Sequence, residues 1–503
     1  MLDFETLDYN DEKTWDLICS GKTVGVFQLE SHLGREWSSK VKPRNISELA
    51  DVISIIRPGV LEVKEGNKTM TEIFQERKCG ISPAVPIHYL LEPLLESTHQ
   101  ILCYQEQIMA IANKIAGFSL EETDILRRGL GKKDAKLIAS IRSGFVDGCI
   151  KTSSLTDEEA GHIFDIIEKS ARYSFNKSHA IGYAKISYAT AWEKTHKPLK
   201  FYCEWLSDCK HRVNGKMELR QLINDAKGFG VTIKGPNISH IEEEFYIRDN
   251  IIYFGLANIK NVGSATAKPF LELLATLDTP IEELSWFELM STVLEMADIS
   301  ISIGLISTGA IPGSRVKMLY EFKTWKSLND RERAWIIGKK GSEPFENLEK
   351  AIESLLNSKY SRRQKKVEEL LHLLKNPPHG LEDSSDWIVK TEQEMLGFPI
   401  SIDRLEQSRI PDTTCQEVHD GKTGEMTIGV EVQRVKEHTI KGGKNIGNKM
   451  AFIGVTDGTE LDCIAFSDVW QEDGHLLYEG NCVALTISPS DKGGFIIQKV
   501  YQL

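Results

Sequence analysis

The segment ARYSFNKSHAIGYA, residues 171–184, gathers several side chains that can bind phosphates and bases within one short run. Lys177 and His179 can donate hydrogen bonds to phosphate, and Asn176 can bond a phosphate or a sugar. Tyr173 offers a ring on which a base can stack. Each residue also has an ordinary structural explanation, such as a packed aromatic ring or a satisfied core histidine. The run therefore indicates a nucleotide site only together with other evidence.

A second cluster of cations lies in TDILRRGLGKKD, residues 123–134. Its members are Arg127, Arg128, Lys132 and Lys133. We expect a helix that ends before Gly129 and a flexible loop after it, with the four cations around this end. Planar guanidinium groups grip phosphate oxygens in pairs, which suits the charged tail of a nucleoside triphosphate. A solvated basic turn is the alternative explanation.

The charge of the chain is unevenly distributed. The whole chain carries −12, but residues 171–220 hold ten lysines and arginines against four acidic residues. A local basic surface is compatible with phosphate binding, because the global charge speaks mainly to solubility. A solvated helix face rich in lysine explains the same excess equally well.

Length and composition limit the class of protein. The 503 residues, 41% hydrophobic and 27% charged, suit three or four globular domains. The apolar runs are too short to span a membrane, and the acidic N-terminus lacks an apolar signal core. The nine cysteines include no C-x-x-C pair. We therefore expect a cytoplasmic protein without a membrane partner or a structural zinc site.

The pattern divides the chain into four parts. Residues 1–217 are typical of helices, and residues 218–314 contain short strands followed by two glycine-turned helical units. Residues 315–425 indicate a polar helical connector and a loop. Five short strands in residues 426–503 predict a small β-barrel. The expected fold class is multidomain and mainly α, with a C-terminal all-β domain.

Four motifs occur together in a known family of enzymes. They are TVGVFQLES at 23–31, IIRPGV at 55–60, YQEQIMAIANKIAGFSLEETDILRRGLGKKD at 104–134 and YSFNKSHAIGYAKISYATAWEKTHKP at 173–198. By their order and spacing the chain resembles the bacterial family C replicative DNA polymerases, the DNA polymerase III alpha subunits. In that family these motifs form the fingers domain, which binds the incoming deoxynucleoside triphosphate (dNTP) and the template.

The resemblance implies a set of nucleotide-binding residues. Arg127 and Arg128 would contact the triphosphate, and the polar residues of 173–179 would face the nucleotide pocket. The complete expected set is Arg57, Arg127, Arg128, Lys132, Lys133, Tyr173, Asn176, Lys177 and His179. The family's arginine-proline-glycine-proline run appears here as RPGV, with Val60 in the last place.

Further motifs imply DNA-binding regions. IIYFGLANIKNVGSATA at 251–267 and GLISTGAI at 304–311 resemble the family's tandem helix-hairpin-helix region, in which a glycine hairpin presents N–H groups to duplex phosphate. TEQEMLGFPIS at 391–401 matches the stretch before the family's OB-fold barrel. The expected DNA-binding residues are Lys260, Gly263, Ser264, Ala265, Lys441, Lys444 and Lys449. Phe452 and Phe466 are candidate stacking residues, although core positions are commoner for such rings.

The carboxylates of a polymerase are not found in the sequence. Polymerases use two divalent metals held by carboxylates, and in this family two of these form an Asp-x-Asp pair in the palm. The 503 residues contain no Asp-x-Asp, so we expect no catalytic or metal-binding residue among them. The Mg²⁺ ligands of the assembled polymerase are then expected on a separate chain that carries the palm and the N-terminal domain.

Two functions remain at this point. The first is the C-terminal part of a split replicative DNA polymerase, which binds dNTP and primer–template DNA and is inactive alone. The alternative is a non-catalytic DNA-binding accessory or remnant protein. We favour the first, because an accessory protein would need only the hairpins and the barrel. The family also binds a sliding clamp through a short glutamine-and-aromatic peptide, of which we find no clear copy.

Overall fold

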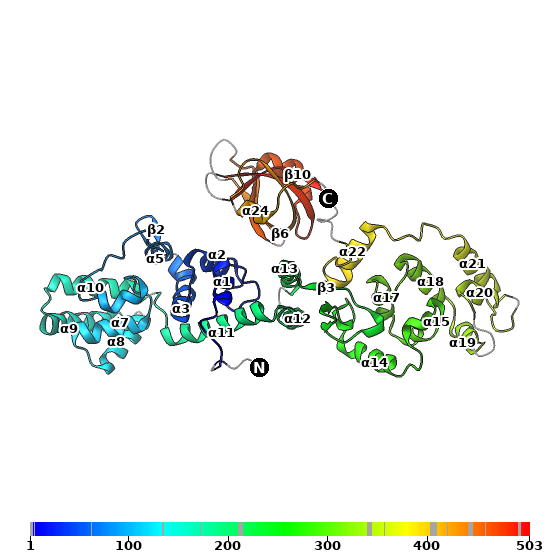
Figure 1. Cartoon of the computed structure of the whole chain (residues 1–503), viewed down its shortest axis with the longest axis horizontal. Coiled ribbons are helices and arrows are strands. Elements are labelled where there is room, and N and C mark those ends of the chain that lie inside the picture. Colours follow the sequence, from blue (N-terminus) through cyan, green and yellow to red (C-terminus); the bar gives the residue numbers. More distant parts are fainter. Residues whose placement is uncertain are drawn as a thin grey trace. The chain divides into compact units, whose positions relative to one another are not determined.

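The computed structural model describes the chain except for a few short segments. These are residues 1–3, 5, 62, 133–134, 172, 210–214, 340–344, 357, 403–409, 420, 441–445, 458 and 491–493. The described chain is mainly helical and ends in a closed β-barrel, which confirms the predicted fold class (Figure 1). It divides into two compact units, residues 1–198 and 199–503. The expected domain boundaries after 217, 314 and 425 stay predictions.

Part of the first unit is a bundle of four helices, drawn in cyan in Figure 1. They are α7 (Gln105–Ala116), α8 (Leu120–Lys132), α9 (Ala135–Ser153) and α10 (Asp157–Ser170). Helix α9 contacts each of the other three. Their apolar stripes meet in a common core, in which Phe145 and Phe164 are fully buried with ring centroids 5.4 Å apart.

The end of α8 differs from the prediction. Its capping box is present, since the Ser119 N–H donates to Glu122 Oε2 at 2.8 Å and the Glu122 N–H donates to Ser119 Oγ at 3.3 Å. The helix does not end before Gly129, however, but continues to Lys132. Gly129 and Gly131 each cost about 1 kcal/mol in a helix relative to alanine, and burying Leu130 on the core face returns about 2 kcal/mol, which offsets this cost.

The other part of the first unit packs around a long helix, α11 (Lys177–His196), which contacts α3 and α1. Its shorter elements are α1 (Glu12–Ser20), α2 (His32–Val41), α3 (Ile46–Ile55), α4 (Pro58–Leu61), β1 (Lys64–Glu65), β2 (Lys68–Thr69), α5 (Met70–Lys78), α6 (Glu92–Leu95) and η1 (Glu96–Thr98). Lys194 of α11 is fully buried and donates to the carbonyls of Lys22 and Val24, both at 2.8 Å. This cation of the basic segment is therefore not available at the surface.

The second unit opens with two helices and a small sheet. The helices are α12 (Pro198–Cys209), whose first residue belongs to the first unit, and α13 (Gly215–Gly228). The sheet has the order β3 (Thr232–Lys234), β5 (Ile251–Tyr253), β4 (Tyr246–Arg248), with β3 and β5 parallel. A short helix, η2 (Ile238–His240), lies between β3 and β4 in the sequence.

Both expected glycine-turned helical units are present in the second unit. The first joins η3 (Leu256–Asn258) to α14 (Ser264–Ala275), and the second joins α17 (Ile299–Ser307) to α18 (Arg315–Ser327). In the second turn Gly309 has φ +73° and Gly313 has φ +133°, conformations that side chains disfavour. Between these two helical units, the sequence forms η4 (Ile281–Glu283), α15 (Trp286–Ser291) and α16 (Val293–Met296).

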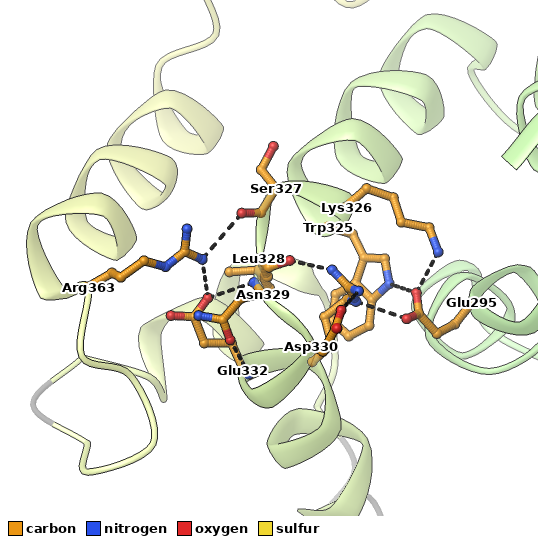
Figure 2. A network of polar contacts seen from close by, with 10 residues as sticks. Glu295, Trp325, Lys326, Ser327, Leu328, Asn329, Asp330, Glu332 and Arg363 are labelled. Atoms are coloured by element: carbon orange, nitrogen blue, oxygen red, sulfur yellow. Dashed lines mark hydrogen bonds and ion pairs between the residues drawn. The ribbon is translucent and has the colours of Figure 1, made fainter.

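In the described part of the expected connector, which begins with α18 at residue 315, the next four helices follow. They are α19 (Asp330–Lys339), α20 (Leu348–Glu353), α21 (Gln364–Lys375) and α22 (Ser385–Leu396). The junction between α16, α18 and α19 is held by Glu295, whose carboxylate accepts bonds from three donors (Figure 2). These donors are Trp325 Nε1 at 2.9 Å, Lys326 Nζ at 2.7 Å and Arg333 Nε at 2.8 Å.

The fully buried carboxylate of Glu332 holds the start of α19 and the segment before α21 (Figure 2). It accepts from the Asn329 N–H at 2.9 Å and from Ser361 Oγ at 2.6 Å. Arg363 forms an ion pair with the same carboxylate. The helices of the connector are thus joined by paired charges as well as by apolar packing, because a buried charge is tolerated only when it is paired.

The last domain is a five-stranded closed barrel. Its strands are β6 (Met426–Thr439), β7 (Lys449–Thr456), β8 (Glu460–Ala465), β9 (Cys482–Pro489) and β10 (Phe495–Gln502). They close in the order β10-β8-β7-β6-β9, with β10 parallel to β8 and antiparallel to β9. The other helical elements here are α24 (Cys415–His419), α25 (Ser467–Asp473) and η5 (Gly474–Leu476). All five predicted strands are confirmed, and the topology is that of an OB fold.

Among the described residues, no helix combines the length and the apolarity that crossing a bilayer requires.

Removing the charge of Glu295 should lower the free energy of unfolding and should make this free energy depend less on pH. Burial alone raises the pKa of Glu295, but the bonds from Lys326 and Trp325 outweigh burial and hold this pKa below its ordinary value of 4.5. The contact therefore stabilises the fold above about pH 4.5 and is lost as the pH falls through the lower folded pKa. Glu295→Gln should cost about 2–3 kcal/mol at pH 7 and much less at pH 3.5.

The measurement is denaturant unfolding at the two pH values. The matched control is Glu368→Gln, which removes the same charge from an exposed position on α21. An equal effect of both variants, or a cost for Glu295→Gln that does not shrink in acid, would contradict the role of this network.

Candidate nucleotide and DNA interface

The segment before α11 is paired with the segment before α7. Tyr104 and Phe175 form a parallel β-bridge. The Phe175 N–H donates to the Cys103 carbonyl and the Gln105 N–H donates to the Phe175 carbonyl, both at 2.9 Å. Two of the motifs that could bind a nucleotide, far apart in the sequence, therefore lie side by side.

A carboxylate from α7 holds the first turn of α11. Glu106 Oε1 accepts from Asn176 Nδ2 and Glu106 Oε2 accepts from the Lys177 N–H, both at 2.9 Å. The Asn176 side-chain oxygen in turn accepts from the His179 N–H at 2.8 Å, which makes Asn176 the N-cap of α11. A negative charge at this end of a helix is favourable because of the helix dipole. The Asn176–His179 turn is thus fixed without a ligand.

Arg57 contacts the backbone that precedes this turn. Its guanidinium donates to the Tyr173 carbonyl at 2.6 Å and to the Ser54 carbonyl at 3.0 Å. It also lies 4.1 Å from the centre of the Phe175 ring, a cation–π contact. Burial lowers the pKa of Arg57. The guanidinium therefore connects the RPGV motif to the residues that precede α11.

Tyr173 is packed inside the first unit. Only 8% of its surface is exposed, and its hydroxyl is hydrogen-bonded to that of Ser170 at 3.1 Å. Burial raises the pKa of Tyr173. In this arrangement the ring faces the interior, and the backbone carbonyl is the group that contacts Arg57.

A row of four aromatic rings lies beside the start of α11. The ring centroids of Phe175 and His179 are 5.5 Å apart, those of His179 and Tyr183 are 4.0 Å apart, and those of Tyr183 and Phe27 are 5.2 Å apart. A Cβ on Gly182 would meet no atom within 4 Å, so the helix surface beside the row is open. The sequence analysis missed Tyr183 and Phe27, although the spacing of four between His179 and Tyr183 places both on one helix face.

Beneath Lys177 lies an acidic group that sequence reasoning also missed. Asp51 of α3 is 3% exposed, and its carboxylate accepts from the Tyr104 hydroxyl at 2.5 Å. Lys177 Nζ lies 5.5 Å from the centre of the Tyr104 ring. Burial raises the pKa of Asp51 to about 7, against the opposing effects of Tyr104 and Lys177. A carboxyl in the apolar run SELADVISI was the available signal.

The arginine pair is held by one carboxylate of its own helix. Asp124 Oδ1 accepts from Arg127 Nη2 at 2.8 Å, and Asp124 Oδ2 pairs with Arg128 Nη2 at 2.6 Å. The bond from Arg127 holds the pKa of Asp124 below its ordinary value. The Arg128 side chain is 67% exposed and that of Arg127 is 37% exposed, so an anion can reach both. The side chain of Lys132 and the whole of Lys133 lie outside the described residues.

Helix α7 contacts the two elements that carry the cations, α8 and the start of α11. It packs against α8, which carries the arginine pair, and its Glu106 holds the start of α11. The described contacts do not join the arginines directly to the Asn176–His179 turn. The relation between the two groups is therefore set by one shared helix.

The expected DNA-binding residues of the second unit are exposed where they are described. Gly263, Ser264 and Ala265 form the exposed start of α14. Lys260 Nζ pairs with Glu394 at 2.9 Å, and Lys449 Nζ at the start of β7 pairs with Glu437 at 2.9 Å. Lys441 and Lys444 lie outside the described residues.

Two phenylalanines of the barrel domain lie at its surface. Phe452 on β7 is 42% exposed, and Phe466 before α25 is 43% exposed. Neither belongs to the barrel core, which consists of other side chains. Both rings can therefore be reached by a base.

No metal site is found in the described part of the chain. None of its histidine, cysteine, aspartate and glutamate side chains gather in a group of three or more that could hold an ion.

Removing the charge of Glu106 should loosen the start of α11. Glu106→Gln keeps one acceptor but loses the charge at the helix N-terminus, which is worth about 1 kcal/mol. Hydrogen exchange at the Lys177 amide should become severalfold faster, because its acceptor is weakened. Glu121→Gln, at an exposed position in the first turn of α8, is the matched control. Unchanged exchange at Lys177 would argue against this positioning role.

The buried Asp51 should make stability fall as the pH rises. Its folded pKa of about 7 lies above its ordinary 3.8, so folding favours the protonated form and stability declines between about pH 4 and 7. Asp51→Asn should remove this decline, a gain relative to the wild type of about 2–4 kcal/mol between pH 5 and 8. Denaturant unfolding at pH 5 and pH 8 measures this gain in the free energy of unfolding. The control is Asp147→Asn, at an exposed position. Parallel pH profiles of wild type and Asp51→Asn would refute it.

The comparisons with known proteins agree on one family. Residues 1–153 match the bacterial DNA polymerase III alpha subunit finger domain. Over 96% of this chain, the DNA polymerase III subunit alpha of Aquifex aeolicus is 32% identical, and over 95% of it that of Bacillus subtilis is 28% identical. The DNA polymerase III subunit alpha of Caulobacter vibrioides is 36% identical over 54% of this chain and 23% of its own length.

The chain is shorter than these relatives. It spans 38% of the Aquifex protein and 40% of the Bacillus protein, so the matches concern about two fifths of each. The part that matches the finger domain, residues 1–153, is mainly helical where it is described and ends with α9. The chain therefore belongs to the family of the bacterial DNA polymerase III alpha subunits and carries the finger domain of that family.

Proposed function

We propose that this chain binds the incoming dNTP and the primer–template duplex for a bacterial replicative DNA polymerase. The observation that carries the proposal is the Asn176–His179 turn, which Glu106 holds, while Arg57 holds the backbone just before it at Tyr173. A turn that is ordered before binding costs little entropy when the nucleotide arrives. A protein that bound only DNA would have no need of this arrangement.

The dNTP is bound by the residues that remain accessible. Arg127 and Arg128 exchange their bonds to Asp124 for bonds to the triphosphate, which carries more charge than one carboxylate. Lys177 and His179 add donors at the start of α11, and the His179–Tyr183 rings form a stacking surface for the base. In this proposal Arg57 and Tyr173 position the turn, and Lys132 and Lys133 extend the cationic surface.

The duplex is bound by the second unit. The N–H groups of Gly263, Ser264 and Ala265 and the Lys260 ammonium contact backbone phosphate. In the barrel domain, Lys441, Lys444 and Lys449 contact phosphate, and Phe452 and Phe466 stack on unpaired bases.

The bond-forming step requires groups that this sequence does not contain. Mg²⁺ activates the primer hydroxyl and neutralises the pyrophosphate when it is held by palm carboxylates, and the 503 residues have no Asp-x-Asp pair. We assign these carboxylates to a separate chain that assembles with this one. The contribution of the present residues is positional and electrostatic, because they orient the triphosphate and the duplex.

Primer extension with purified chains tests this division of labour. The chain alone should not extend a primer in Mg²⁺, and it should do so after addition of the chain that carries the palm. Extension by the isolated chain would contradict the assignment. DNA binding with no effect on extension in any combination would favour the alternative, a non-catalytic accessory protein.

The arginine pair should affect nucleotide use more than duplex binding. Arg128→Ala removes a charge-assisted contact to the triphosphate, so the apparent KM for dNTP in the assembled polymerase should rise about tenfold or more. The Kd for duplex, measured on the same preparation, should change less than about twofold. Lys151→Ala, at an exposed position on α9, is the control for loss of one positive charge. Equal losses in KM and Kd for Arg128→Ala would overturn the assignment.

A further inference from the structure

The second hairpin unit has a carboxylate at the place where a phosphate would bind. Asp383 lies in the loop between α21 and α22. Its Oδ2 accepts from the Arg315 N–H and its Oδ1 accepts from the Val316 N–H, both at 2.9 Å. The Ser314 hydroxyl lies 3.2 Å from Asp383 Oδ1 and donates to the Leu381 carbonyl at 2.9 Å. The first-turn donors of α18 therefore already have an anionic partner from the same chain.

Arg315 of the second hairpin unit is also used internally, whereas Lys317 in the same turn is 60% exposed. Arg315 Nη1 donates to Glu392 Oε1 at 2.8 Å, and the two side chains are 11% and 0% exposed. Glu392 Oε2 in turn accepts from the N–H groups of Ile400 and Ser401, at 2.7 and 2.8 Å. The motif TEQEMLGFPIS, which precedes the barrel in the sequence, is thereby fastened to the second hairpin unit.

The first hairpin unit differs in how its helix begins. The N–H of Gly263, the N-cap of α14, donates to Thr266 Oγ1 at 3.2 Å, and among the described residues no carboxylate contact is found at the N–H groups of Ser264 and Ala265. Gly263, Ser264 and Ala265 are all exposed. Its cations are also accessible, since the side chains of Lys260 and Lys268 are 46% and 64% exposed. An incoming anion would meet no carboxylate of the described residues at the N–H groups of Ser264 and Ala265, whereas Asp383 already occupies the first N–H groups of α18.

Helix α22 contacts both hairpin units, the one that contains α14 and the one that contains α18. The Lys260 N–H donates to the Met395 carbonyl at 2.8 Å, and Lys260 Nζ pairs with Glu394 at 2.9 Å. Glu392 of the same helix pairs with Arg315. One helix of the connector therefore joins the two units, but it leaves the start of α14 uncovered.

We propose that the two hairpin units have different tasks: the first binds duplex phosphate, and the second is a structural anchor in which Asp383 takes the place of the phosphate. The proposal rests on the proposed function, because it assumes that the chain binds duplex DNA. An external phosphate would have to displace a carboxylate that the chain itself supplies at high effective concentration. It would also approach the buried Glu392, whose charge repels it.

Two charge-adding variants test the proposal in the full chain. Ala265→Glu places a carboxylate at the second position of α14, and Pro312→Glu places one at an exposed position of the second hairpin. Ala265→Glu is compatible with the helix, because a negative charge in the first turn is favourable. Duplex binding is measured by fluorescence anisotropy over a series of salt concentrations.

We expect Ala265→Glu to weaken binding about tenfold and to reduce the slope of log K against log salt by about one, since one phosphate contact is lost. Pro312→Glu should leave both quantities unchanged within about twofold. Equal losses for the two variants, or a loss only for Pro312→Glu, would overturn the proposal. Failure of the wild type itself to bind duplex would instead overturn the proposed function.

A third variant addresses the anchor directly. Asp383→Asn removes the charge and one acceptor from the start of α18, so we expect the Tm to fall by several degrees while duplex affinity stays within about twofold. Tighter duplex binding with a steeper salt dependence would show that Asp383 competes with a phosphate for a second DNA site. An unchanged Tm would show that Asp383 is no anchor.

Discussion

The proposed nucleotide surface depends on one carboxylate, that of Glu106, which fixes where α11 begins. The turn that it holds contains Asn176, Lys177 and His179, and the ring row continues from this turn along the helix. Arg57 completes the constraint from the side of α3 by binding the backbone just before the turn. Since α7 also packs against α8, the same helix relates this turn to the arginine pair.

Carboxylates satisfy cations and N–H groups at several places in this chain, and their exposure decides what the groups can do. Asp124 holds two arginines at the surface, where a stronger anion can take its place. Glu392 and Asp383 hold Arg315 and the start of α18 in an interface with the connector. The first kind of contact orders a binding site, whereas the second builds the fold, because desolvated pairs are costly to break.

Local signals in the sequence predicted the elements well and their tertiary roles less well. Capping residues and alternating strands fixed the start of α8 and the five strands of the barrel, because both depend on neighbours in the sequence. The end of α8 was missed because burial of Leu130 offsets the cost of the two glycines, a tertiary effect. The interior position of Tyr173 and the contacts of Asp51 and Asp383 join residues far apart, and no local pattern encodes them.

The barrel closes through its last strand. Because β10 pairs with β8 on one side and with β9 on the other, it closes the sheet into a barrel. A protease cut or frameshift that removed this strand would open two unpaired edges at once, each a template for association with another chain. Loss of this strand would thus turn a closed domain into one that associates with other chains, while the helices of residues 1–198 kept their own core.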